Sequence, residues 1–435
     1  MAITAVAVLW WWSGDDDPFA RMSDEEILAA AHAFYESRPY FERPRPYSEI
    51  PAGLPDLRAE TCGQCHAAIY EEWKISTHAR AFRDDAQFMA ELEKSSGDYD
   101  EHHPDDVSWM CLNCHTPMIN QLERLVVGLE NGEIGKPIYV DNPFFDPELQ
   151  DDAISCATCH VQDGVVYGPR GDTDAPHPVA LGEDLMNENN CVSCHQAEAH
   201  FPDQNLACFF TTGAEWERSP AAAAGQGCQD CHMPTVHRKV AEGFDVPERE
   251  TRHHWFGGSL IPKHPDFEEE IAPLRAIFGS GASLSVVTDE ESPSGYSVRV
   301  YNEFAGHLFP TGDPERHVDV VARIFDGEGE LVGEDEVRIG SIYEWWPQIR
   351  LISDNRIEAG ESLYLPLTGD WPEAVEVEVV AEKFRMHQEA FDYHDLEGRY
   401  VNSREFHRSR WRIDAEGATL LVLEDDFGRR DTLEP

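Results

Sequence analysis

The sequence predicts two unlike parts, a mostly irregular and α-helical domain followed by an all-β C-terminal domain built as an immunoglobulin-like sandwich. Three observations lead to this prediction. Five cysteine frames of one spacing crowd into residues 62–232, a proline-rich stretch precedes them at residues 38–58, and strand-like alternation begins after residue 280. With 435 residues the chain is long enough for two or three domains.

Composition excludes several classes of partner. Hydrophobic residues make up 41% of the chain and aromatic residues 10%, which is enough to build a buried core. The 34 Lys and Arg residues against 83 Asp and Glu residues give a formal net charge of -49. Such a charge repels the phosphates of nucleic acids and anionic lipid surfaces, so neither is an expected partner. Salt screens the repulsion between acidic side chains, so this composition favours a protein from a saline habitat.

Residues 1–57 form the first predicted region. Residues 2–12 (AITAVAVLWWW) are apolar but too short to span a bilayer, and no basic residue precedes them as in a signal peptide. They are interpreted as the remnant of a longer signal or anchor, or as an interfacial apolar stub, the only expected membrane contact. A helix is predicted over residues 23–37, with Ser23 as N-cap and Glu26 completing a capping box. The prolines of residues 38–58 then predict an extended strap.

Residues 58–279 contain five copies of the frame C-x-x-C-H. In c-type cytochromes this frame attaches haem: two thiols bond to the porphyrin vinyl groups, and the adjacent histidine is the proximal iron ligand. Zinc knuckles and disulfides are the alternatives, but neither requires histidine directly after the second cysteine. The sequence therefore predicts five covalently bound haem c groups, with iron. Their attachment residues are Cys62, Cys65 and His66; Cys111, Cys114 and His115; Cys156, Cys159 and His160; Cys191, Cys194 and His195; and Cys228, Cys231 and His232.

The frames leave little protein for each haem, so the porphyrins themselves must supply much of the buried apolar surface. Haems that are dense in the sequence are expected to lie close together in space. The remaining cysteine, Cys208, stands among apolar neighbours and is predicted to be a buried small hydrophobic residue.

Residues 280–385 alternate apolar and polar side chains with a period of two. The segments YSVRVYNE, HVDVVARIF, EDEVRIG, SLYLPLT and AVEVEVVAEKF are separated by turn residues, as in an antiparallel sandwich. Residues 386–435 are predicted to be a mixed tail with a final strand at GATLLVLE.

Several motifs together resemble one family. CHAAIYEEWKISTHARAF, CLNCHTPMINQ, ISCATCHVQDGVVYGP, APHPV, GCQDCHMP, HHWFGG and AGHLFPTG occur in an order that is similar to multihaem c-type cytochromes. That family is related to the tetrahaem cytochrome that accepts electrons from hydroxylamine oxidoreductase. The resemblance covers about residues 58–315. It implies close-packed haems, mostly with two axial histidines, that transfer electrons; five frames instead of four are a departure from the tetrahaem relative.

The resemblance also indicates the distal ligands. His78 in STHARAF and His177 in DAPHPV match distal positions of the family, and His254 matches better than the adjacent His253. His307, in AGHLFPTG, is a further predicted ligand that would tie the β domain to a haem. The fifth ligand stays open: His237 is preferred, and His102, His103, His200 and His264 compete with it.

The expected function is electron transfer along a chain of haems, in the periplasm or outside the cell, because c-type haem is attached outside the cytoplasm. No catalytic residue is predicted, and the protein is more simply an electron carrier than an enzyme. Redox proteins, or further copies of the chain in an extracellular filament, are the expected partners. The alternative is an oxidoreductase acting on a small nitrogen or sulfur compound at one open-site haem. Pentahaem nitrite reductases have lysine in place of histidine at the end of their catalytic frame. No frame of this chain ends in lysine, which counts against the enzyme.

Overall fold

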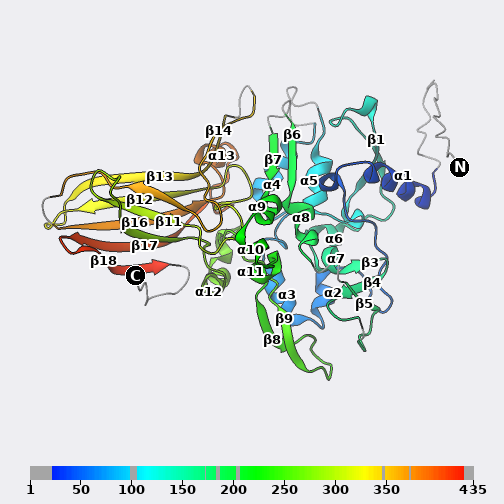
Figure 1. Ribbon diagram of the computed structural model, residues 1–435. Coiled ribbons are helices and arrows are strands. Elements are labelled where there is room, and N and C mark those ends of the chain that lie inside the picture. Colours follow the sequence, from blue (N-terminus) through cyan, green and yellow to red (C-terminus); the bar gives the residue numbers. More distant parts are fainter. Residues whose placement is uncertain are drawn as a thin grey trace.

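The computed structural model describes residues 22–97, 105–171, 173–182, 187–201, 206–344, 348–371 and 374–425. Figure 1 shows two parts side by side: a region of short helices and hairpins up to helix α12 (Glu268–Phe278), and a β-rich region that follows it. Within the described residues, no helix is both long enough and apolar enough to cross a membrane.

Helix α1 (Asp24–Glu36) begins at the predicted capping box. The backbone N–H of Glu26 donates to Ser23 Oγ at 3.3 Å, and the backbone N–H of Ser23 donates to the Glu26 carboxylate at 2.8 Å. The helix buries Ala31 and Tyr35 in a cluster with Trp109 of the haem-frame region. This contact anchors the N-terminal helix to the domain that carries the cysteine frames.

The proline-rich segment runs extended along the same domain, apart from one short 3-10 turn, η1 (Tyr40–Glu42). Arg45 exchanges backbone hydrogen bonds with the chain on both sides of Met118, since its N–H donates to Pro117 and its carbonyl accepts from Ile119. Further along, Gly53 adopts a φ of +94°, and a Cβ there would lie 2.3 Å from the Pro176 carbonyl oxygen. Only glycine allows this close approach to the loop that carries His177.

The helices that follow are short. Besides α12, they are α2 (Ala59–Gly63), α3 (Ala67–Lys74), α4 (Ala86–Lys94), α5 (Ser108–His115), α6 (Pro147–Asp151), α7 (Cys156–His160), α8 (Asn189–His195), α9 (Thr212–Glu217), α10 (Pro220–Ala223) and α11 (Cys228–His232), with the 3-10 turns η2 (Ile119–Gln121), η3 (Glu130–Gly132) and η5 (Pro265–Phe267).

Small sheets separate these helices. Antiparallel hairpins dominate, and the hairpin β8–β9 projects from the body of the domain (Figure 1). The strands are β1 (Arg124–Leu129) with β2 (Pro137–Asp141); β3 (Val161–Gln162), β4 (Val165–Gly168) and β5 (Val179–Leu181); β6 (Ala197–Phe201) with β7 (Leu206–Phe210); and β8 (Thr235–Lys239) with β9 (Glu248–Arg252).

The β domain consists of two sheets. One has three strands in the order β10-β11-β15, and the other has six in the order β14-β13-β12-β16-β17-β18. Paired strands are antiparallel throughout. Their bounds are β10 (Ser283–Thr288), β11 (Tyr296–Tyr301), β12 (His317–Phe325), β13 (Leu331–Glu344), β14 (Arg350–Asp354), β15 (Ser362–Pro366), β16 (Val375–Phe384), β17 (Ser403–Asp414) and β18 (Gly417–Asp425); helix α13 (Gln388–Tyr393) lies between β16 and β17.

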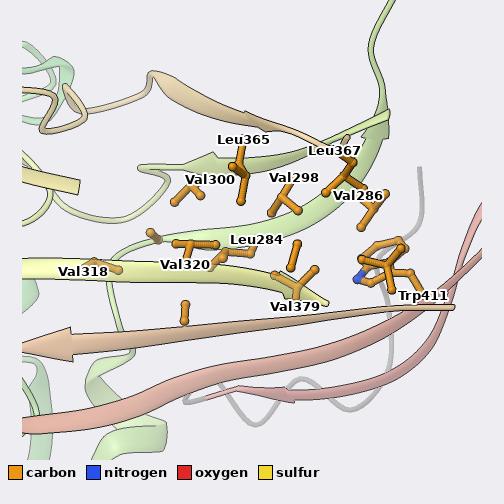
Figure 2. Packing of buried hydrophobic residues seen from close by; sticks show 14 of the residues in the cluster. Leu284, Val286, Val298, Val300, Val318, Val320, Leu365, Leu367, Val379 and Trp411 are labelled. Atoms are coloured by element: carbon orange, nitrogen blue, oxygen red, sulfur yellow. The ribbon is translucent and has the colours of Figure 1, made fainter. Parts of the chain in front are cut away.

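The core of this domain lies between the two sheets (Figure 2). On β12 the side chains of Val318, Val320, Ala322 and Ile324 are fully buried and alternate with more exposed residues. This is the period-two pattern that the sequence predicted for the segment. Burying each such valine or isoleucine contributes about 1.5–3 kcal/mol.

The predicted order of a helical domain followed by a β domain is confirmed. The immunoglobulin-like topology within the β domain stays a prediction. Strands β17 and β18 pair into the six-stranded sheet, so the sheet continues beyond residue 385 into the segment predicted to be a mixed tail. The reason is that β17 contributes Phe406, Trp411 and Ile413 to the core.

Candidate haem-binding sites

Each C-x-x-C-H frame lies on or at the end of a short helix. Helices α7 and α11 consist of the frame alone, the frames of Cys111 and Cys191 end α5 and α8, and the first frame begins within α2 and ends at His66, the N-cap of α3. Residues three apart in a helical turn lie on one face, so the two thiols of a frame face the same side. All eleven cysteines are free of disulfides, which leaves the frame thiols available for thioether bonds.

Backbone carbonyls orient the proximal imidazoles. In four of the frames the ring Nδ1 lies within hydrogen-bond distance of a carbonyl oxygen from another part of the domain. An Nδ1–H that donates to a carbonyl leaves the Nε2 lone pair free for a metal, which is the usual way in which proteins orient a histidine ligand. The pairs are His66 with Val240 at 2.7 Å, His115 with Ala81 at 2.5 Å, His160 with Tyr167 at 2.8 Å, and His232 with Gly257 at 2.5 Å.

Three proximal imidazoles each face a second imidazole at nearly the same separation. The ring centroids are 6.3 Å apart for His78 and His195, 6.2 Å for His160 and His254, and 6.2 Å for His232 and His307. Two metal–nitrogen bonds of about 2 Å, plus about 1.1 Å from each nitrogen to its ring centre, give roughly 6.2 Å. The spacing therefore matches two imidazoles on opposite sides of one iron.

The electrostatics of these rings also suit iron. Desolvation by the surrounding protein lowers the pKa of His78 and His254 to about 3, and that of His195 and His307 to about 4. Desolvation likewise lowers the pKa of the proximal His160 and His232. A metal binds only the neutral imidazole, so these histidines are in the correct protonation state at neutral pH. The residues present therefore fit haem c with two axial histidines.

The pairing crosses long stretches of sequence. His78 follows the first frame, yet it faces His195 of the fourth frame, with Phe256 packed 4.5 Å from its ring. His307 reaches His232 from the loop after β11, where Asn302 Nδ2 donates to the His307 carbonyl and His307 Nδ1 lies 2.8 Å from the Leu308 carbonyl. The β domain thus supplies a side chain to the haem-frame domain.

The structure separates the two neighbours His253 and His254. The ring of His254 faces His160, and its Nδ1 lies 2.8 Å from the Arg252 carbonyl. His253 is buried, with its Nε2 3.4 Å from the Glu72 carboxylate and its ring packed edge-on to Phe278. His253 therefore packs as a core residue, while His254 is the neighbour whose ring faces the imidazole of a frame.

The other candidate histidines lie elsewhere. The three pairs do not include His66, His115 or His177, so the structure does not assign a distal partner to the first and second frames. His237 is on the projecting strand β8, with a side chain that is 65% exposed and an Nδ1 3.7 Å from Glu248. His264 accepts a hydrogen bond from the Asp266 backbone at the start of η5, and His200 on β6 lies 6.2 Å from Phe209. His102 and His103 lie outside the described residues.

The frames are close neighbours in space. The thiol of Cys62 lies beside that of Cys156, Cys114 beside Cys194, and Cys191 beside Cys228, close enough for each pair to shift one another's pKa. Cys159 lies within electrostatic range of Cys194. The fourth frame therefore has the second, third and fifth frames around it, and the first frame adjoins the third.

Sequence reasoning missed the residues that hold the imidazoles in place. The carbonyls of Val240, Ala81, Tyr167 and Gly257 carry no sequence signal, because any residue can present a backbone oxygen. The ring of Phe88 is nearly parallel to that of His115, with 3.6 Å between the centroids. Its distance from the frames along the sequence does not mark it as a neighbour of this histidine either. Cys208 lies on β7 opposite Ala199, and burial raises the pKa of its thiol well above the usual range, as expected for a small apolar residue.

Comparison with known proteins agrees with this chemistry. Residues 61–133, which contain the first two frames, match the family model described as cytochrome c554 and c-prime. No curated protein matches the chain. Among solved structures, the crystal structure of a penta-haem cytochrome c552 from Thermochromatium tepidum shares the fold, with a TM-score of 0.53 and 15% identity, over 86% of this chain and 100% of that one.

Two independent findings thus converge, a family match over the first two frames and a fold shared along most of the chain. The resemblance seen in the sequence is confirmed: residues 61–133 are similar to the cytochrome c554 and c-prime family, and the chain shares the fold of a penta-haem cytochrome.

Proposed function

We propose that this protein carries five covalent haem c groups and transfers electrons along them outside the cytoplasm. The observation that carries the proposal is the set of three imidazole pairs at 6.2–6.3 Å. Two axial histidines keep the iron geometry nearly constant between its oxidation states, so little reorganisation accompanies each electron. They also exclude outside ligands, which suits a carrier rather than a catalyst.

The proposed axial pairs are His195 with His78, His160 with His254, and His232 with His307. For His66 and His115, the sequence proposals His177 and His237 stand. The exposure of His237 on a projecting hairpin makes it the weaker of the two as a ligand within its own chain. The haem itself supplies the electron-accepting chemistry, while the protein orients each imidazole through its Nδ1 hydrogen bond.

The contacts between thiols support a branched order of haems. The haem of the first frame adjoins that of the third, the third adjoins the fourth, and the second and fifth both adjoin the fourth. The haem on Cys191 and Cys194 is then the junction through which electrons pass between the branches.

Haem stoichiometry and spin state test the proposal together. Purified protein should carry five haems per chain that resist extraction with acidified acetone, and at least three should be low-spin in the oxidised state. Variants that replace both cysteines of one frame, such as Cys228→Ala with Cys231→Ala, should lose one haem of the five. Stoichiometric zinc without porphyrin would end the proposal, and a spectrum dominated by high-spin haem would contradict the axial pairs.

An alternative enzymatic function rests on the first or second frame. His66 and His115 are not in any of the three pairs, so the haems of these two frames are the candidates for an open iron site. A small nitrogen or sulfur compound would react there. Binding of carbon monoxide to one reduced haem, together with turnover of hydroxylamine or nitrite, would favour this function; five low-spin haems would exclude it.

Assembly into a filament is the remaining proposal, and the exposed His237 favours it. An imidazole on a projecting hairpin can reach a haem of the next copy, which would continue the haem chain from one subunit to another. Electron microscopy across protein and salt concentration tests this. Filaments that disappear in His237→Ala are the expected result, and dispersed monomers under all conditions would contradict it.

A further inference from the structure

A cluster of positive charge lies where the β domain meets the second haem frame. Three cations form this cationic cluster: Lys263 from the loop before η5, Arg316 from the residue before β12, and Arg385 from the residue after β16. The ring of Tyr400 lies among them, 5.5 Å from Lys263 Nζ and 5.3 Å from the Arg385 guanidinium carbon. Burial lowers the pKa of Lys263 to about 8; the charges of Arg385 and Arg316 act in the same direction, and Asp85 opposes them. The three cations therefore lie close enough to interact.

Carboxylates of the chain neutralise only part of this charge. Lys263 forms an ion pair with Asp85, and both side chains are almost fully buried. Arg385 is only 3% exposed; one of its terminal nitrogens donates to the Ile261 carbonyl, while its buried Nε has no hydrogen-bond partner. An unpaired guanidinium group in a protein interior is costly unless an anion approaches it.

The charge of the Arg316 guanidinium group is also incompletely neutralised. Its Nη1 lies 3.4 Å from the Thr311 carbonyl, which is a weak contact, and no carboxylate is in hydrogen-bond contact with it among the described residues. A Cβ at Gly312 would lie 2.7 Å from the same nitrogen, so glycine at this position lets the guanidinium group lie against the backbone. Burial raises the pKa of the neighbouring Asp313, which weakens that residue as a counter-charge.

The cluster adjoins the second frame. Asp85, the ion-pair partner of Lys263, accepts a hydrogen bond from the backbone N–H of Phe88 at 3.3 Å, and the Phe88 ring is nearly parallel to that of His115, with 3.6 Å between the ring centroids. Any haem on Cys111 and Cys114 therefore stands beside the cluster, and the only carboxylates that a haem carries are its two propionates.

We propose that Arg385 and Arg316 bind a propionate carboxylate of the haem on Cys111 and Cys114, and thereby fix that haem to the β domain. The inference rests on the proposed function, since it requires the haem of the second frame. Arg385 and Arg316 act as positioning residues: each would donate charge-assisted hydrogen bonds to the propionate oxygens. Positive charge beside the porphyrin favours ferrous over ferric iron, so it holds the potential of this haem above the value it would have without the cluster.

A spectroscopic redox titration of the haem-loaded protein tests the assignment. In Arg385→Gln, the midpoint potential of one haem should shift to more negative values while the other potentials and the haem content stay unchanged. Arg385→Lys should keep the midpoint potential of this haem close to that of the unmodified protein, because lysine keeps the positive charge. Arg316→Gln should lower the midpoint potential of the same haem. Arg323→Gln is the matched control, because it removes one charge from the exposed face of β12, where Arg323 pairs with Glu334.

Two results would overturn the inference. Unchanged potentials in both Arg385→Gln and Arg316→Gln, with five haems still attached, would refute it and leave the proposed function intact. The cluster could also bind a small oxyanion in place of the propionate. A spectral change on titration with nitrite in the unmodified protein, lost in Arg385→Gln, would assign the site to an external anion. Loss of haem from all variants and the control alike would instead count against the proposed function.

Discussion

The imidazole of His307 in the β domain lies 6.2 Å from that of His232 in the fifth frame, with 17° between the ring planes. The two residues belong to different domains, and their separation matches two ligands of one iron. If iron joins them, docking of the β domain and ligation of this haem are one event. Folding of the two domains is then coupled through a coordinate bond.

His307→Ala should therefore create one high-spin haem that binds carbon monoxide, and it should weaken the docking of the β domain. The replacement removes the distal nitrogen and leaves the proximal His232 in place. Optical and electron paramagnetic resonance spectra measure the first effect, and limited proteolysis between residues 279 and 317 measures the second. His387→Ala, which removes an imidazole at the start of α13, is the control. An unchanged low-spin spectrum in His307→Ala would show that His307 only packs.

Glu215→Ala should destabilise the same junction. Glu215 of α9 is buried, and its carboxylate accepts from Thr311 Oγ1 at 2.5 Å, Thr211 Oγ1 at 2.8 Å and Arg356 Nη1 at 3.1 Å. Removing one partner of a buried ion pair costs about 3–5 kcal/mol of unfolding free energy. Denaturant unfolding measures the loss, and the exposed Glu217 on the same helix provides the control variant Glu217→Ala. Equal stability of the two variants would contradict a structural role for this network.

Glu315 should contribute a loss of stability as the pH rises from about 4.5 to 8. Burial raises its pKa from 4.5 to about 8, and the nearby Asp313 and Glu91 add to the shift, while Lys94 opposes it. Between these values the unfolded chain has lost the proton that the folded chain still holds, so the unfolding free energy declines across this window and stays low above it. Glu315→Gln should flatten this decline by up to a few kcal/mol. Melting curves at pH 5 and pH 8 measure it; an identical pH dependence in the variant would contradict the assignment.

Thermal stability should rise with ionic strength. A net charge of -49 makes the folded surface repel itself, and salt screens that repulsion. Melting temperatures in sodium chloride from low concentration to about 1 M test this expectation. Sucrose at matched water activity separates screening from a general solute effect. A melting temperature that stays flat or falls over the range would refute the prediction.

The sequence by itself determined the local chemistry. A C-x-x-C-H frame sets both thiols and the proximal imidazole within one helical turn, so the haem-attachment residues could be named without a fold. The alternation in residues 317–325 likewise predicted β12, because side chains of a strand point to opposite faces. The capping box at Ser23 and Glu26 is local in the same sense.

Only the tertiary structure decided which imidazoles face one another. His78 stands close to the first frame in the chain and yet faces His195, and the fifth frame takes its partner from the β domain. The adjacent His253 and His254 have the same side chain, and packing against Glu72 and Phe278 separates their roles. The cationic cluster, which draws on the haem-frame domain and the β domain, shows no pattern along the chain. A ligand pair or a charge cluster depends on distances across space, and such distances arise only when the domains pack together.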